Sequence, residues 1–306
     1  SARFLDALRL KFGAAVQENI SLAPYTSARI GGSADIFVTV KSADELAQAV
    51  QAAWDYGMPY FVLGGGSNIL VSDKGARGLV ILNRAKEVRF QEDEPPAVWC
   101  ESGVVLSNLA NRCAAKGLSG LEWAAAVPGT VGGAVYGNAG AFGGDMAANL
   151  IWAEALTENG REKFSAAQME YGYRSSVLKR GGARAVVLSA LLKLNRSSAA
   201  EASALISQWS ERRKSTQPPG ASMGSMFKNP EGDHAGRLIE AAGLKGTRIG
   251  GAEISVKHAN FFISHGETRA SDVRALIDLT RKTVLEKFGV HLELEIELIG
   301  EWDVER

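Results

Sequence analysis

The stretch Leu63-Gly-Gly-Gly-Ser-Asn-Ile-Leu70 decides how the whole chain is interpreted. It follows an apolar segment, residues 59–63, that has the composition of a β-strand. The three consecutive glycines, residues 64–66, remove every Cβ from the turn, so several backbone N–H groups can converge on one anion. Ser67 and Asn68 add side-chain donors at the same point. The stretch therefore predicts a pyrophosphate-binding loop, although a tight turn that binds nothing explains it equally well.

A second glycine-rich run, residues 126–144, holds seven glycines and almost no charge. Pro128 suits the first turn of a helix, and Gly132 and Gly133 allow close approach to a ligand or to another element. Two such runs predict an extended dinucleotide that is held at two points; close packing between elements is the alternative. Neither run reads Gly-x-Gly-x-x-Gly, and no acidic residue follows at the expected distance, which argues against a Rossmann NAD(P) site.

Length and composition place the chain among globular proteins. With 306 residues and 46% apolar content, we expect two or three domains. Lys+Arg and Asp+Glu number 34 each, so nothing draws the whole chain to nucleic acid or to an anionic membrane. Two isolated cysteines fit a reducing compartment, and no stretch approaches the length of a membrane span. We expect a cytoplasmic protein without nucleic-acid binding or membrane insertion.

Hydrophobic periodicity predicts a mixture of helices and strands. A capping box, Ser42-Ala-Asp-Glu45, opens one of the helices, and Glu158-Asn-Gly160 predicts a hairpin. The breaker cluster Gln217-Pro-Pro-Gly220 predicts the boundary to a last domain. The expected helices are residues 2–16, 43–56, 106–116, 197–214, 235–242 and 271–288. The expected strands are residues 35–40, 59–63, 78–83, 97–101, 185–194, 259–264 and 292–299.

The segment Gly224-Ser-Met-Phe-Lys-Asn-Pro230 places Ser, Lys and Asn close together after the breaker cluster. A serine beside a lysine suggests an activated nucleophile, but no Ser-x-x-Lys spacing or partner histidine is present. From the residues alone, an exposed loop is the favoured interpretation because Ser, Asn, Gly and Pro fill turns.

Three further patterns leave their function open. The closing segment Leu292-Glu-Leu-Glu-Ile-Glu-Leu298 alternates strictly, so its glutamates share one face. A solvated outer face explains them, whereas a strand edge at a cleft would make one of them functional. Tyr171-Gly-Tyr-Arg-Ser-Ser176 fits structural stacking and carboxylate recognition equally well. The four histidines show no metal-ligand spacing, and we expect no metal site.

Taken in order, these segments resemble the UDP-N-acetylenolpyruvoylglucosamine reductase family of bacterial peptidoglycan synthesis. The resemblance covers nearly the whole chain. The two glycine runs alone would indicate only the wider class of FAD-binding folds, whereas the Tyr-Arg-Ser-Ser and Gly-Ser-x-Phe-Lys-Asn-Pro segments are specific. The matching stretches are Thr26-Ser-Ala-Arg-Ile-Gly-Gly32, Leu63–Leu70, Gly120-Leu-Glu-Trp123, Pro128-Gly-Thr-Val-Gly-Gly133, Asn138-Ala-Gly140, Tyr171–Ser176, Gly224–Pro230, Ala235-Gly-Arg-Leu-Ile-Glu240, Lys257-His-Ala-Asn260 and the final strand with Glu295.

The resemblance implies an α+β fold. Residues 1–90 and 91–216 would form the two subdomains of an FAD-binding fold of the vanillyl-alcohol oxidase (PCMH) type. Residues 217–306 would form an α+β substrate-binding domain. The chain is similar to the shorter subtype, which lacks a tyrosine-bearing insertion that clamps the substrate.

The resemblance also implies the reaction and its residues. NADPH reduces non-covalently bound FAD, and the reduced flavin delivers hydride to the enolpyruvyl ether of UDP-N-acetylglucosamine, giving UDP-N-acetylmuramate. By family motif, Ser225 is the proton donor, while Arg174 and Glu295 polarise the substrate carboxylate and stabilise the enolate. Lys228 and Asn229 would bind the substrate. The implied FAD-binding residues are Gly64, Gly65, Gly66, Ser67, Asn68, Pro128, Gly129, Thr130, Gly132, Gly133 and Asn138.

Two other functions compete with this one. The first is another FAD-dependent oxidase or dehydrogenase of the same fold; Glu295 and the loop from Ser225 to Pro230 argue against it, because an unrelated oxidase has no reason to carry them. The second is a non-enzymatic nucleotide-binding module, which would take up no flavin.

Overall fold

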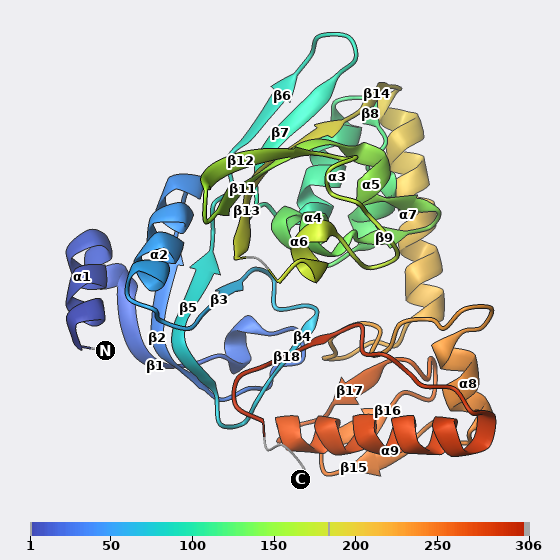
Figure 1. Ribbon diagram of the computed structural model, residues 1–306. Helices are drawn as coiled ribbons and strands as arrows, with labels where there is room; N and C mark the ends of the chain where they lie inside the picture. The colour runs from blue at the N-terminus through green and yellow to red at the C-terminus, as the bar shows by residue number, and fades with distance from the viewer. Residues whose placement is uncertain (1, 183, 303–306) are drawn as a thin grey trace. The chain divides into compact units, whose positions relative to one another are not determined.

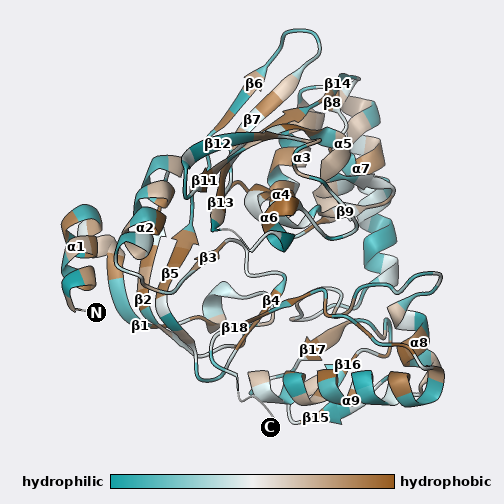
Figure 2. Ribbon diagram, viewed as in Figure 1, coloured by the Kyte–Doolittle hydropathy of each residue, from teal (hydrophilic) through white to brown (hydrophobic). Residues whose placement is uncertain are grey.

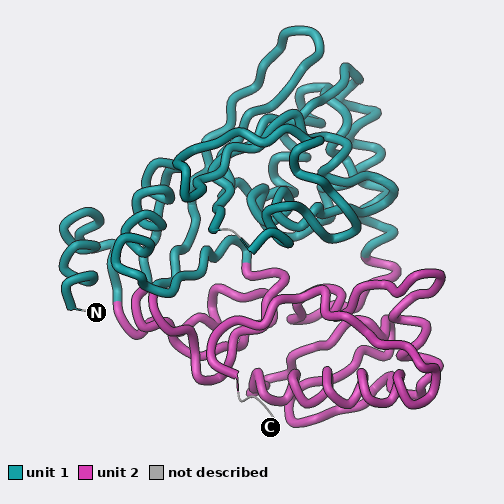
Figure 3. The backbone as a smooth tube through the Cα atoms, viewed as in Figure 1, with its two compact units in different colours: residues 1–17, 37–65, 79–213 teal, residues 18–36, 66–78, 214–306 magenta. Residues whose placement is uncertain are grey.

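The computed structural model describes residues 2–182 and 184–302, which pack into two compact units (Figures 1 and 3). Unit 1 comprises residues 1–17, 37–65 and 79–213; unit 2 comprises residues 18–36, 66–78 and 214–306. The chain therefore passes from one unit to the other within the first glycine run, between Gly65 and Gly66. The division into three consecutive domains stays a prediction from the sequence.

Unit 1 contains most of the helices and strands of the first two thirds of the chain. Its elements are α1 (Ala2–Phe12), a 3-10 turn (Gly13–Ala15), α2 (Ala43–Asp55), β3 (Tyr60–Leu63), β6 (Val88–Gln91), β7 (Ala97–Glu101), α3 (Leu106–Ala115), β8 (Leu118–Ser119), η3 (Glu122–Ala126), α4 (Val131–Gly137), β9 (Gly140–Ala141), β10 (Gly144–Asp145), α5 (Met146–Asn149), β11 (Leu150–Thr157), β12 (Gly160–Ser165), α6 (Val177–Arg180), β13 (Ala185–Lys193) and β14 (Asn195–Arg196).

A strand–helix–strand segment leads into the first glycine run. Ser42 caps α2 by accepting a hydrogen bond from Glu45 N at 3.1 Å, and the Glu45 carboxylate accepts one from Lys41 N at 2.6 Å. After α2, β3 pairs in parallel with β5 (Ala76–Asn83), with Leu63 opposite Leu82. The order of this sheet is β1 (Val16–Ser21), β2 (Ser33–Val40), β5 and β3. The predicted helix and strand are therefore present, and the glycines start at the carboxyl end of β3.

A five-stranded sheet of order β12-β11-β13-β7-β6 forms the centre of unit 1 (Figure 1). The predicted hairpin joins β11 to β12, with Thr157 opposite Gly160. Helix α4 packs on β13 and β7 and buries Val131 and Val135 against them. Apolar residues of β13 and α4 are brown in Figure 2. This core fixes the position of α4 and of the glycine-rich run that precedes it.

Unit 2 is built around a long helix and short strands. Strands β1 (Val16–Ser21), β2 (Ser33–Val40) and β5 and helix α7 (Ala199–Thr216) run from one unit into the other. The elements of unit 2 itself are η2 (Ala23–Tyr25), β4 (Ile69–Val71), α8 (Ala235–Ala241), β15 (Arg248–Ile249), β16 (Ala252–Ile254), β17 (Phe262–Ser264), α9 (Ala270–Phe288) and β18 (Glu297–Ile299). Their core includes Leu70, Phe227, Phe262, Leu276 and Ile296.

Four expectations from the sequence need correction. The first helix ends at Phe12 rather than near residue 16, because the chain turns there and continues as β1. Strand β17 covers only Phe262–Ser264, since the residues before it form a turn around Asn260. The closing strand is shortened to Glu297–Ile299, which pairs in parallel with β4, a strand that the sequence analysis missed. Pro128 lies before α4, which begins at Val131 after its N-cap Thr130, so the proline is not in the first turn.

Within residues 2–182 and 184–302, no helix is long and apolar enough to cross a membrane. In the same part of the chain, no group of three or more His, Cys, Asp or Glu side chains is arranged to hold a metal ion. Cys100 and Cys113 are both buried as free thiols.

Asp73 fastens the end of β4 to the long helix. Its two carboxylate oxygens accept hydrogen bonds from Ala270 N at 2.8 Å and Ser271 N at 2.9 Å, the first two residues of α9. Burial of the carboxyl acts to raise its pKa, but the hydrogen bonds from Ser271 and Ala270 outweigh it and lower the pKa of Asp73 below its ordinary value. The negative charge also complements the positive end of the helix.

We therefore predict that Asp73→Ala lowers the free energy of unfolding by about 1 kcal/mol at neutral pH, as for other helix caps. Because the folded-state pKa is depressed, this stabilisation is present above the ordinary pKa of Asp and is lost as pH falls through the folded-state value. Urea unfolding of parent and variant at several pH values measures the difference between their free energies of unfolding. Asp93→Ala, on the exposed β6–β7 turn, is the control and should change nothing. If the difference in the free energy of unfolding between Asp73→Ala and the parent stayed the same in acid, the charged Asp73 carboxylate would not be what stabilises the start of α9.

Candidate functional site

The two glycine runs meet in unit 1, where Gly64 packs on the Thr130 side chain and Gly65 on the Gly129 backbone. A Cβ on Gly64 would lie 2.6 Å from Thr130 Oγ1, and one on Gly65 would lie 3.0 Å from Gly129 Cα. A side chain at either position would therefore require the second run to shift. The two runs predicted from the sequence pack closely at this point, and their role in binding a phosphate stays a prediction.

Gly132 and Gly133 serve different purposes. Gly132 N donates to Ser102 O at 2.8 Å, and a Cβ on Gly132 would lie 2.9 Å from Ser102 Cβ. This is close packing against another segment, the alternative considered for the run. The nearest atom to a Cβ on Gly133 is 4.0 Å away, and the residue is exposed. Gly133 therefore leaves open space beside the backbone at the start of α4.

The segment Tyr171–Ser176 is docked on the carboxyl end of α4. Tyr171 Oη donates to Val135 O at 2.8 Å, and Ser176 Oγ donates to Tyr136 O at 2.6 Å. These hydroxyls satisfy carbonyls that the end of a helix leaves without partners. Burial raises the pKa of Tyr171, so its phenol stays protonated as the donor. The segment is thereby held at both ends.

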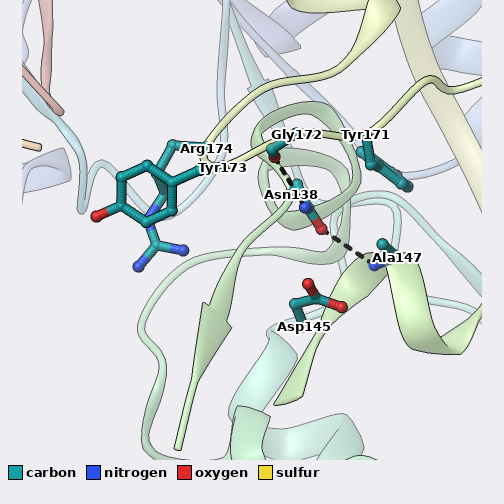
Figure 4. Close-up of a pocket in the computed structure, with 7 residues that line it drawn as sticks. All are labelled: Asn138, Asp145, Ala147, Tyr171, Gly172, Tyr173 and Arg174. Carbon is teal, nitrogen blue, oxygen red and sulfur yellow. Dashed lines mark hydrogen bonds between the residues drawn. The ribbon is translucent and has the colours of Figure 1, made fainter. Parts of the chain in front are cut away.

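Asn138 holds the middle of this segment (Figure 4). It is the left-handed C-cap of α4, with φ of 49°, and it is buried. Its Nδ2 donates to Gly172 O at 3.0 Å, and its Oδ1 accepts from Ala147 N at 3.0 Å. Both ends of the amide therefore bind the protein's own backbone. The predicted role of Asn138 in cofactor binding stays a prediction, and the geometry shows a support for the segment that carries Arg174.

Arg174 lines a pocket of about 370 Å³ together with Asn138, Asp145 and Tyr173. Its φ of 54° is unusual for a residue with a side chain. Its Nη2 donates to Gly140 O at 3.1 Å, and its guanidinium carbon lies 5.2 Å from the centre of the Tyr173 ring. Figure 4 shows the guanidinium beside this ring. The sequence pattern left stacking and carboxylate recognition open, and the structure contains the stacking contact within a pocket.

Asp145 was not singled out from the sequence. It follows the last glycine of the second run and caps α5 by accepting from Ala148 N at 3.0 Å. The signal that could have found it is its place as an N-cap residue directly after Gly144. Its carboxylate and Arg174 give the pocket one group of each charge.

In unit 2, Ser225 lies on a segment that is paired on both sides. Ser225 forms a β-bridge with Phe261, and Phe227 forms one with Leu294. Met226 and Phe227 have no exposed surface. The exposed loop favoured by the residues alone is therefore wrong for this part of the segment, because it is built into the core; Ser225 itself is half-buried.

Glu295 lies on the neighbouring strand of chain. Its backbone N donates to Met226 O at 2.9 Å, which sets it beside the residue that follows Ser225. On the other side, Asn68 Nδ2 donates to Glu295 O at 3.1 Å, and Asn68 O accepts from Glu297 N at 3.0 Å. The strict alternation of the closing segment did not identify which glutamate meets a site. These contacts place Glu295 next to the Ser225 segment.

Lys228 and Asn229 lie farther along the same loop. Lys228 Nζ forms an ion pair with Glu293 Oε2 at 3.3 Å, and Lys228 N donates to Glu293 O. Asn229 Oδ1 accepts from Ala235 N at 3.0 Å, so it caps the start of α8. Asn229 thus has a structural role at the start of α8, and its role in substrate binding stays a prediction.

Each unit brings a subset of the predicted site residues together. Unit 1 holds Gly64, Gly65, the run from Pro128 to Gly133, Asn138 and Arg174. Unit 2 holds Gly66, Ser67, Asn68, Ser225, Lys228, Asn229 and Glu295. A Cβ on Gly66, which has φ of 61°, would lie 2.1 Å from Tyr25 O, so this glycine too is required by its surroundings. The catalytic and binding roles of these residues stay predictions.

Comparison with known families gives two matches along the chain. Residues 34–163 match the FAD binding domain family. Residues 215–299 match the C-terminal domain of UDP-N-acetylenolpyruvoylglucosamine reductase. A UDP-N-acetylenolpyruvoylglucosamine reductase from Chloroflexus aggregans is 44% identical over 292 residues, which are 93% of this chain and 97% of that protein.

Solved structures agree with these matches. The UDP-N-acetylenolpyruvylglucosamine reductase of Thermus caldophilus superposes with a TM-score of 0.77 at 36% identity, covering 92% of this chain and 97% of that one. An alkyldihydroxyacetonephosphate synthase shares the fold over 64% of this chain and 44% of its own, with a TM-score of 0.50 and 19% identity. The predicted α+β, FAD-binding fold is confirmed. The chain belongs to the UDP-N-acetylenolpyruvoylglucosamine reductase family.

Proposed function

We propose that this chain is an NADPH-dependent flavoprotein that reduces the enolpyruvyl ether of UDP-N-acetylglucosamine to UDP-N-acetylmuramate, a step of peptidoglycan synthesis. The observation that carries the proposal is the pairing of the Ser225 segment with the Glu295 segment through Met226 O and Glu295 N, at 2.9 Å. It lays the segments that carry Ser225 and Glu295 side by side, within the residues that match the family's C-terminal domain. A flavin oxidase that merely shares the fold has no use for this pair.

The residues of unit 1 fit FAD. The glycine cradle, where Gly64 and Gly65 pack on Thr130 and Gly129, offers backbone N–H groups to a pyrophosphate without a charged side chain. Burial raises the pKa of Cys113 to about 12 and raises that of Cys100 further, so neither supplies a thiolate for a covalent link. FAD held by these residues would supply the hydride chemistry that links NADPH to the methylene carbon of the substrate.

Arg174 would hold the carboxylate of the enolpyruvyl group. Hydride addition moves negative charge into that carboxylate and its adjoining carbon, so a fixed guanidinium binds more strongly in the transition state than in the ground state. The planar fork matches both carboxylate oxygens. The hydrogen bond to Gly140 O and the Tyr173 ring hold the guanidinium in place, which keeps the cost of orienting it low.

Ser225 would give its hydroxyl proton to the enolate carbon. A serine is a weak acid, but an enolate is a strong base, so the position of Oγ matters more than its acidity. Glu295, on the neighbouring segment, would stabilise the enolate. Both groups act on charge that appears only during the reaction, and therefore both accelerate the chemical step.

Lys228 and Asn229 would bind the UDP end of the substrate. The Lys228–Glu293 ion pair is largely exposed on its carboxylate side, and such pairs contribute little in water. A diphosphate can therefore compete with Glu293 for the lysine. Asn229 follows directly and keeps its place by capping α8.

Replacing Gly65 tests the cofactor assignment. We predict that Gly65→Val abolishes flavin retention, because its branched side chain meets the Gly129 backbone, which cannot yield as a flexible side chain would. Absorbance of the purified protein near the flavin bands measures the loss. Gly137→Ala is the matched control, since a Cβ at Gly137 meets nothing within 4 Å and its φ is not positive. A Gly65→Val protein that stays yellow would mean that the cradle does not bind FAD.

Replacing Ser225 tests the proton donor. We predict that Ser225→Ala leaves flavin reduction by NADPH nearly intact and slows the second half-reaction by about 10²–10⁴-fold, the usual contribution of general acid catalysis. Stopped-flow absorbance, first with NADPH and then with the enolpyruvyl substrate, separates the two steps. Ser225→Cys should recover part of the rate, and Ser222→Ala on the same segment should resemble the parent. If the reduced flavin of Ser225→Ala were reoxidised by the enolpyruvyl substrate at the parent rate, Ser225 would not be the proton donor.

Replacing Arg174 tests the grip on the carboxylate. Arg174→Lys keeps the charge but loses the planar fork, so we predict a loss on the order of 10²-fold in the second half-reaction, comparable to the removal of one oxyanion-stabilising donor. Flavin reduction by NADPH should change far less. The same two-step absorbance measurement decides. Equal losses in both half-reactions would show that Arg174 supports the cofactor or the fold instead of the substrate.

A further inference from the structure

The backbone around Met226 is held from two sides. Met226 N donates to Asn260 O at 2.8 Å, and Met226 O accepts from Glu295 N at 2.9 Å. Ser225 is the preceding residue, and it forms its own bridge with Phe261. Three stretches of chain, around Asn260, Met226 and Glu295, are therefore laid side by side within unit 2. The position of Ser225 depends on both neighbours.

The Asn260 side chain completes this arrangement. Its Oδ1 accepts from Phe227 N at 2.9 Å, and its Nδ2 donates to Phe227 O at 2.8 Å. One amide thus binds both the N–H and the C=O of Phe227. The isolated β-bridges at this point do not form a regular strand pairing that would satisfy these groups. Asn260 is 3% exposed and Phe227 is fully buried, so no water replaces these bonds without opening the core. Removing the amide would leave two buried backbone groups unsatisfied.

Asn260 is held in turn by the residues around it. Its backbone N donates to His258 Nδ1 at 3.2 Å, and the His258 ring packs edge-on against Phe261 at 5.0 Å. Burial, followed by the charge of Lys245, lowers the pKa of His258, so Nδ1 stays available as an acceptor. The turn that presents Asn260 is therefore also held by contacts of its own.

We infer that Asn260 is a positioning residue for the proton donor: its amide clamps Phe227 and so sets the place of Ser225 Oγ relative to Glu295. The inference rests on the proposed function, in which Ser225 protonates the enolate. Asn260 itself touches neither substrate nor flavin in this mechanism. Its effect on catalysis passes through the Ser225 segment alone. Because the Ser225 hydroxyl is a weak acid, its contribution to the rate depends on its position, and a small displacement of the segment should slow the reaction.

The test uses the flavin-loaded enzyme and the two half-reactions. We expect Asn260→Ala to retain flavin and its reduction by NADPH, and to slow reoxidation by the enolpyruvyl substrate about 10- to 100-fold, as a misplacement near 1 Å does. Asn260→Asp is the second variant: it keeps an acceptor for Phe227 N and nearly the same volume. It places an oxygen against Phe227 O, so it too should slow the second half-reaction.

Thr268→Val is the matched control. Thr268 Oγ1 also binds both backbone groups of one residue, donating to His265 O and accepting from His265 N, each at 2.9 Å. Thr268 is buried in the same unit. Unlike Asn260, its side chain binds a residue outside the Ser225 segment. Its loss should reduce stability and leave both half-reactions near the parent rates. Equal slowing of the second half-reaction in Thr268→Val and Asn260→Ala would overturn the positioning role.

A double-mutant cycle separates positioning from general damage. If Asn260 acts through Ser225, adding Asn260→Ala to Ser225→Ala should slow the second half-reaction no further. Additive losses would overturn the inference, as would loss of flavin from both Asn260 variants when Thr268→Val retains it. A parent-like rate in Ser225→Ala alone would instead remove the proposed donor role, so the two failures are distinguishable.

Discussion

The parallel pairing of β4 with β18 is the contact that fixes the segment carrying Glu295 within unit 2. It joins Ile69–Val71, directly after the first glycine run, to Glu297–Ile299 near the end of the described chain. Asn68 extends the pairing by bonding to Glu295 O and Glu297 N. Contacts between segments so far apart in sequence carry a loop-closure cost that local structure does not. The apolar core around Leu70, Phe227 and Ile296 offsets that cost.

Asparagine amides recur where this framework leaves regular secondary structure. Asn68, Asn138 and Asn260 each bind backbone groups of a segment that carries a predicted site residue. The physical reason is that an amide offers a donor and an acceptor at the spacing of a peptide group, so it can replace a missing ladder partner. Segments that present functional side chains are irregular, and their backbone groups still have to be satisfied when buried. The asparagines do this without adding a charge.

Local signals explain what the sequence predicted well. The capping box at Ser42, the hairpin at Glu158-Asn-Gly160 and the two glycine runs each specify their geometry within a few residues, and all are found in the structure. Strand β4 was missed because three residues are too short to show alternation. The closing strand was predicted too long because alternation continues through residues that pair only singly with neighbouring chain. Nothing in the sequence signals that Asn260 clamps Phe227 or that Asp73 caps α9, since these contacts depend on the tertiary fold.

The proposed site treats two kinds of negative charge differently. The pyrophosphate of a bound cofactor keeps its charge throughout the reaction, and neutral backbone groups at Gly64, Gly65 and Gly129 are suited to hold it steadily. In the proposed reaction, the enolpyruvyl carboxylate and its adjoining carbon would gain charge only as hydride arrives, and this is the charge on which Arg174, Ser225 and Glu295 would act. Interactions that strengthen in the transition state raise the rate, whereas those that are constant only retain the ligand. In that proposal the three side chains would need more structural support than the glycines, because their effect would depend on the position of single atoms. The hydrogen bonds at Gly140, Asn68 and Asn260 hold the guanidinium of Arg174 and the backbone of the segments that carry Glu295 and Ser225.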